Sequence, residues 1–75
     1  MKPETLIQCV ELQLGRNPVK MKDRFFEDLA AESVDMVHLV VAVEEISGIF
    51  IPEEVMPELK TVQDLFDFVT AKWKE

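Results

Sequence analysis

The chain has 75 residues, of which 48% are hydrophobic and 31% charged, and its 15 acidic and eight basic residues give a formal net charge of -7. A chain of this length buries only about 60% of its unfolded surface, so it has room for one thin core. That argues against a stand-alone enzyme with separate cofactor and substrate halves. The negative charge repels nucleic acids and anionic membranes and attracts basic proteins. We therefore expect one monomeric domain over residues 1–75 that binds no nucleic acid.

The counts of cysteine and histidine exclude two further kinds of site. The single cysteine, Cys9, excludes an internal disulfide, and with one histidine the chain cannot form a zinc site of the usual types. The longest uninterrupted apolar run, Leu39–Val43, is far shorter than a membrane span, and the N-terminus lacks the apolar stretch of a signal peptide. We expect a cytoplasmic protein with no metal and no membrane insertion.

The first predicted element is a helix over Pro3–Leu14. Its apolar residues recur at helical spacing, Pro3 suits a first turn, and Gly15 suits the end. Cys9 flanks the apolar stripe and is expected to be a packed free thiol. Residues Arg16–Asp28 have no sustained period, so we expect a long ordered loop. Four apolar residues are its expected anchors in the core: Val19, Phe25, Phe26 and Leu29.

A second helix is predicted over Ser33–Ser47, followed by Gly48 as its stop. Its β-branched residues favour a strand locally, but the run lacks period-two alternation and exceeds the usual strand length. The apolar residues form two faces of the helix. One face comprises Leu39, Ala42, Val43 and Ile46, and the other comprises Val34, Val37 and Val41. Such a helix lies centrally in the domain or presents one face to a partner.

Two more helical segments complete an all-α fold. Ile51 and Pro52 belong to an extended link, because the residue before proline disfavours helix. A short turn of helix is expected over Glu53–Met56. The last helix is expected over Val62–Trp73, begun by a Thr61–Asp64 capping box. The prediction is thus a bundle of three main helices and one short helix, with a long first loop.

Acidic residues concentrate in the middle of the chain. Residues Phe25–Leu59 contain nine carboxylates and no lysine or arginine, so this stretch sums to -9 and the remainder to +2. One interpretation is an ordinary solvated face. The other is a docking surface for a basic partner with an apolar pocket, because the acids border the valine face of the second predicted helix.

Ser33 has two interpretations at the start of that helix. It is either an ordinary capping serine or an exposed serine that is modified. A phosphate ester there would meet free N–H groups and the positive end of the helix dipole. His38 lies about 140° further round the helix and cannot act as a base for Ser33, so we expect a surface histidine and no catalytic triad.

The run Phe26–Asp35 resembles the signature of acyl carrier proteins, a phenylalanine followed by Asp-Leu-Gly-x-Asp-Ser-Leu-Asp. Four further segments are similar to that family's pattern at consistent separations: Val37–Val40, Val43–Glu45, Ile51–Glu54 and Thr61–Leu65. The resemblance extends over nearly the whole chain. It implies a four-helix acyl-carrier bundle, and a carrier protein rather than an enzyme.

The resemblance also implies a cofactor and partners. In the family, a phosphopantetheinyl transferase joins 4′-phosphopantetheine from coenzyme A to the motif serine, here Ser33. The arm then holds acyl groups as thioesters for acyl-loading and acyl-processing enzymes of fatty acid, lipid or polyketide biosynthesis. The expected partner-binding residues are Glu32, Val34, Asp35, Val37, Val41, Glu44, Glu45, Ile51 and Glu53.

Departures from the family pattern leave alternatives open. Glu32 stands where the family has aspartate, Val34 where it has leucine and Ala30 where it has glycine. His38 stands at a position that is often acidic in the family. These changes suit a specialised carrier with few partners. An aminoacyl or peptidyl carrier and an unmodified structural interaction module are the competing interpretations.

Overall fold

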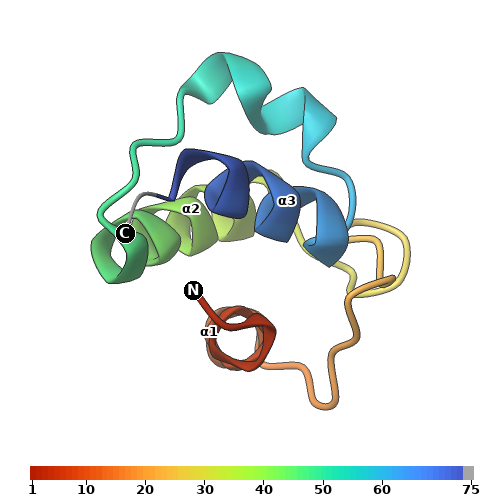
Figure 1. Ribbon diagram of the computed structural model, residues 1–75. Helices are drawn as coiled ribbons and strands as arrows, with labels where there is room; N and C mark the ends of the chain where they lie inside the picture. Colours follow the sequence, from red (N-terminus) through yellow and green to blue (C-terminus); the bar gives the residue numbers. More distant parts are fainter. Residues whose placement is uncertain (74–75) are drawn as a thin grey trace.

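The computed structural model describes residues 1–73, and their regular elements are all helical (Figure 1). In chain order they are α1 (Pro3–Leu14), α2 (Ser33–Ser47), the 3₁₀ helix η1 (Glu53–Glu58) and α3 (Val62–Lys72). The predicted all-α bundle with a long first loop is confirmed. The bounds of α1 and α2 agree with the prediction, whereas η1 continues two residues past Met56 and α3 ends one residue before Trp73.

The helix ends follow the capping chemistry expected from the sequence. Gly15 and Gly48 both take the left-handed conformation, with φ of 66° and 73°, and their N–H groups bond to Glu11 and Glu44 carbonyls. At the start of α3, the Thr61 hydroxyl accepts from the Asp64 N–H at 3.0 Å, and the Asp64 carboxylate accepts from the Thr61 N–H at 3.1 Å. The predicted capping box is therefore present.

One hydrophobic core joins the helices and the loop. In Figure 1, α1 is seen end-on below α2 and α3, and η1 arches over their other side. The buried stripe of α2 has the spacing of a single helix face. The core residues of the three main helices are Leu6, Cys9 and Val10 in α1, Met36, Leu39, Val40 and Val43 in α2, and Val62, Leu65 and Val69 in α3. Burial removes the Cys9 thiol from water and thereby raises its pKa. Cys9 is thus the packed free thiol that the sequence predicts.

Backbone hydrogen bonds fasten the long loop to the start of α3. The Phe25 N–H donates to the Lys60 carbonyl and the Val62 N–H to the Asp23 carbonyl, both at 3.0 Å. The Val19 N–H donates to the Glu11 carboxylate at 2.9 Å. The loop is ordered as predicted, and these contacts fix the position from which the chain enters α2.

Phe26, an expected core anchor, and Ile46, predicted to share a helix face with Leu39 and Val43, lie largely outside the core. Phe26 is 53% exposed, because it follows the fully buried Phe25 in a tight turn where neighbouring side chains point in different directions. Ile46 is 52% exposed. The buried stripe starts at Met36 and recurs three, four and seven residues later, and Ile46 falls to one side of it. Over residues 1–73, no helix has the length and apolarity needed to cross a membrane.

Candidate functional site

Ser33 is the first residue of α2, and its side chain is exposed. The capping position belongs to Glu32, which has extended backbone angles, and the Asp35 carboxylate accepts from the Glu32 N–H at 2.9 Å. The interpretation of Ser33 as the capping serine is therefore wrong. Its hydroxyl lies at the exposed N-terminal end of the helix, where a large partner can reach it.

A tight turn delivers the chain to Ser33. The Asp28 and Leu29 N–H groups both bond to the Arg24 carbonyl, at 2.9 and 3.1 Å, and the Ala31 N–H bonds to the Phe25 carbonyl at 2.9 Å. Between the buried Leu29 and Ala31 side chains, Ala30 has a φ of 55°. The position where the family pattern has glycine thus takes the left-handed conformation that glycine adopts most easily.

The one arginine in this turn is occupied by acids of the turn itself. Arg24 Nε lies 3.1 Å from Asp28 Oδ2, and Arg24 Nη1 lies 3.8 Å from Glu27 Oε2. The hydrogen bond from the Arg24 side chain is the main cause that lowers the pKa of the Asp28 carboxyl. Both ion pairs found within residues 1–73 involve Arg24. None of them neutralises a carboxylate of α2.

The outer face of α2 is apolar and acidic, as the sequence predicted. Val34 and Val37 are each 53% exposed and Val41 is 47% exposed. Glu32 and Glu45 are exposed beside them. About half of each valine side chain remains accessible, so the second apolar face of the helix is available to a partner. His38 is exposed as expected.

Glu44 and Ile51 differ from their expected roles. Glu44 is half-buried, and its Oε2 accepts from the Ile51 N–H at 2.8 Å, so the carboxylate holds the link after α2 in place. Ile51 is only 3% exposed. Its expected place on the partner-facing surface is wrong, because in an extended link neighbouring side chains alternate and Ile51 takes the inward position.

The same alternation exposes a residue that the sequence analysis missed. Phe50 is 74% exposed, next to the buried Ile51. The signal was present in the sequence, since three apolar residues precede Pro52 in an extended link and only alternate ones can face the core. Phe50 therefore belongs to the surface around α2.

A hollow of about 640 Å³ runs along α2 on the side of η1. Ser33 contributes to its wall, and most of the remaining lining is apolar. The lining residues are Phe26, Ser33, Met36, Val37, Val40, Val41, Glu44, Phe50, Ile51, Glu53, Met56 and Pro57. The site thus combines an exposed hydroxyl with an adjacent apolar groove whose charged members are both carboxylates.

Comparison with known proteins agrees with this arrangement. A family model described as the phosphopantetheine attachment site matches residues 4–69. The chain is 44% identical over 61 residues to the acyl carrier protein of Helicobacter hepaticus, covering 81% of this chain and 80% of that protein. It is 47% identical over 62 residues to the acyl carrier protein of Thermosynechococcus vestitus, covering 80% and 76%. The chain belongs to the acyl carrier protein family.

A third relative shows the same extent of similarity. The acyl carrier protein of Bdellovibrio bacteriovorus is 45% identical over 64 residues, covering 83% of this chain and 82% of its own length. The family's prosthetic group is 4′-phosphopantetheine, and the residues matched by the family model include α2 and the turn before it. All three of these relatives are named acyl carrier proteins.

Proposed function

We propose that this protein is a cytoplasmic acyl carrier protein that bears acyl intermediates as thioesters on a 4′-phosphopantetheine arm attached to Ser33. The pathway is fatty acid, lipid or polyketide biosynthesis. The observation that carries the proposal is the position of Ser33, exposed at the first residue of α2 and at the wall of an apolar hollow. In a chain matched by the phosphopantetheine-attachment family, that serine is the residue suited to attachment.

The attachment reaction needs only an accessible hydroxyl from this chain. A bond forms between Ser33 Oγ and the phosphorus of the pantetheine phosphate, and the phosphoanhydride of coenzyme A breaks. Adenosine 3′,5′-bisphosphate leaves, and the serine proton passes to a base of the transferase. The resulting phosphodiester lies at the N-terminal end of α2, where backbone N–H groups and the helix dipole favour an anion. The turn fixed by Arg24 and Asp28 holds this end of the helix in place.

The surroundings of Ser33 fit a long flexible arm with an apolar load. The arm's terminal thiol supplies the thioester when the group is attached. From this chain, the apolar side chains that line the hollow, among them Met36, Val40 and Met56, offer a surface that keeps an acyl chain from water. Because Ser33 is exposed where the groove begins, the arm can swing out of the groove and reach a partner enzyme.

The surface of α2 supports docking of basic partners. We propose contacts from its valines and acids to the transferase and to acyl-loading and acyl-processing enzymes with basic patches. The residues are Glu32, Val34, Asp35, Val37, Val41, Glu44, Glu45 and Glu53, with Ile51 removed from the expected set. Asp35 and Glu44 also make hydrogen bonds within the chain, so their substitution affects folding as well as docking.

Intact mass tests the proposed attachment directly. Apo-protein is incubated with coenzyme A and a broad-specificity phosphopantetheinyl transferase, and we expect a mass gain of one phosphopantetheine group. Ser33→Ala should gain nothing, whereas Ser47→Ala should be modified like wild type. Ser47 is a suitable control because it is the chain's other serine, and its hydroxyl donates to the Val43 carbonyl at 2.7 Å. Unmodified wild-type protein beside a control carrier that is fully loaded would refute the proposal.

The native protein identifies the load. Its mass after isolation from its own cells, measured before and after thioester cleavage, gives the mass of the carried group. A fatty acyl or polyketide intermediate agrees with the proposal. An amino acid or peptide on the arm would instead establish an aminoacyl or peptidyl carrier.

A further inference from the structure

Two phenylalanines frame the hollow beside α2 and leave much of their surface in water. Phe26 comes from the turn before α2 and is 53% exposed, and Phe50 comes from the link after α2 and is 74% exposed. Both line the same hollow, although 23 residues separate them in the sequence. Large apolar side chains gathered around one groove mark a binding surface more often than singly scattered ones do.

The outer valines of α2 extend this apolar surface. Val37 and Val41, which lie between Phe26 and Phe50 in the sequence, also line the hollow. Each of the two valines is about half exposed. Together with Phe26 and Phe50 they make four exposed apolar side chains that line one concave site. We call these four residues the aromatic-valine groove.

Charge identifies what kind of partner fits the groove. Its charged lining residues are Glu44 and Glu53, and no lysine or arginine occurs anywhere in residues 25–59. A second copy of the chain would present the same acids to them and be repelled. A partner segment with lysine or arginine beside its apolar residues would be attracted to the rim and desolvate the phenylalanines.

We propose that Phe26 and Phe50 are the anchor residues for a partner's amphipathic helix, which inserts large apolar side chains into the aromatic-valine groove and pairs flanking lysines or arginines with Glu53 and the acids of α2. This inference deepens the proposed function, since it names the element by which partner enzymes are held near Ser33. Aromatic residues at the centre of an interface dominate its affinity, whereas charges at its rim act mainly on the association rate.

A synthetic helical peptide provides the probe. It carries leucine at two positions four residues apart and lysine on both flanks, and its binding is measured by fluorescence anisotropy. We expect Phe26→Ala and Phe50→Ala each to raise Kd about tenfold, as loss of an interface anchor does. Leu12→Ala is the matched control, because Leu12 is 82% exposed on α1 and does not line the hollow. Its Kd should stay within about twofold of wild type.

Two altered peptides separate the contributions of shape and charge. Replacing both leucines by alanine should abolish most binding at every salt concentration, and replacing the lysines by glutamate should weaken it most at low salt. Equal binding of the alanine peptide would overturn the proposal, as would Kd values for both phenylalanine variants within twofold of wild type. Sedimentation showing a dimer that Phe50→Ala dissociates would also overturn it, in favour of a second copy as occupant.

Apo-protein separates this inference from the proposed function, because it carries no arm but has the complete groove. The peptide should bind the apo-protein, since its binding depends on Phe26, Val37, Val41 and Phe50. Failure of Ser33 to accept the arm with peptide binding intact would refute the carrier function alone. Normal modification with no effect of either phenylalanine would refute the docking groove alone.

Discussion

At the scale of single residues, Ala30 is the clearest point of strain in the approach to Ser33. Its φ of 55° belongs to the region where the Cβ of an L-residue meets its own backbone. Hydrogen bonds on both sides hold it there, from Leu29 to Arg24 and from Ala31 to Phe25. The turn therefore depends on its neighbours for a conformation that glycine would adopt without cost.

Ala30→Gly should stabilise the protein by about 0.5–1 kcal/mol. Relief of the left-handed alanine contributes roughly 1–2 kcal/mol, and the greater freedom of glycine in the unfolded chain removes about 0.4–1 kcal/mol of that gain. Urea unfolding measures the difference. The control is Ala31→Gly, which should be destabilising because Ala31 is buried at ordinary φ. A loss of stability in Ala30→Gly would contradict this account of the turn.

Asp28 should make the stability of this turn depend on pH. Its pKa is lowered from 3.8 in the folded protein, chiefly by the Arg24 side chain, so the carboxylate stabilises the fold at pH values above 3.8. That contribution is lost as pH falls through the lowered value. We expect Asp28→Ala to melt below wild type at pH 7, with the gap closing below pH 3.8. Glu54→Ala, which removes an exposed carboxylate of η1, should show no such gap.

At the scale of elements, the sequence predicts regular helices better than side-chain directions in the connections. The glycine stops and the Thr61 capping box act locally, so they can be identified from neighbouring residues. The two faces of α2 follow from helical spacing. The directions of Phe26 and Ile51 depend on one turn and on one hydrogen bond to Glu44, and both were misassigned. The hollow arises where such connections meet α2, so spacing alone could not predict it.

Glu44 links two elements, and its loss should therefore cost stability. Glu44→Ala removes the acceptor of the half-buried Ile51 N–H, which should destabilise the protein by about 1–2 kcal/mol in urea unfolding. Glu44→Gln keeps an acceptor oxygen and should stay closer to wild type. The adjacent Glu45 is exposed, so Glu45→Ala should change stability by less than about 0.5 kcal/mol. Equal effects at both positions would show that Glu44 contributes only charge.

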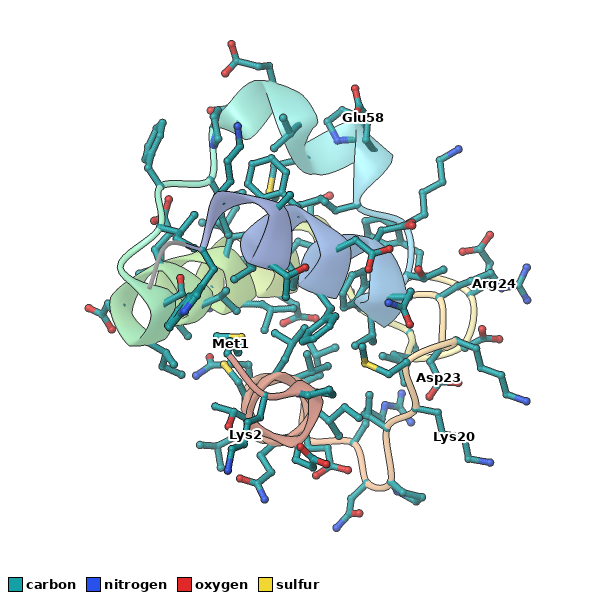
Figure 2. All side chains as sticks on the ribbon, viewed as in Figure 1. Met1, Lys2, Lys20, Asp23, Arg24 and Glu58 are labelled. Atoms are coloured by element: carbon teal, nitrogen blue, oxygen red, sulfur yellow. The ribbon has the colours of Figure 1, made fainter. Side chains whose placement is uncertain are left out.

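At the scale of the whole molecule, the net charge is divided between two regions. Lys20 and Arg24 project from the first loop, whereas Glu58 projects from η1 on another side of the molecule (Figure 2). Residues 25–59 sum to -9 and the rest of the chain to +2. Both ion pairs found within residues 1–73 involve Arg24 with Glu27 or Asp28, so no carboxylate of α2 or η1 in the described residues takes part in an ion pair. The same arrangement that attracts basic partners therefore places like charges close together.

This repulsion should make the melting temperature rise with salt. Added NaCl screens exposed charges, since the Debye length falls from about 30 Å at 0.01 M to about 10 Å at 0.1 M, and the folded state has the denser charge. We expect most of the rise below about 0.15 M, measured by circular dichroism at pH 7. Glu53→Gln with Glu54→Gln should melt higher than wild type at low salt and respond less to NaCl. The matched control, Lys20→Gln with Lys22→Gln, removes positive charge from the loop. Its melting temperature should rise with NaCl at least as much as that of wild type. A salt-independent melting temperature in wild type would show that the clustered carboxylates do not destabilise the fold.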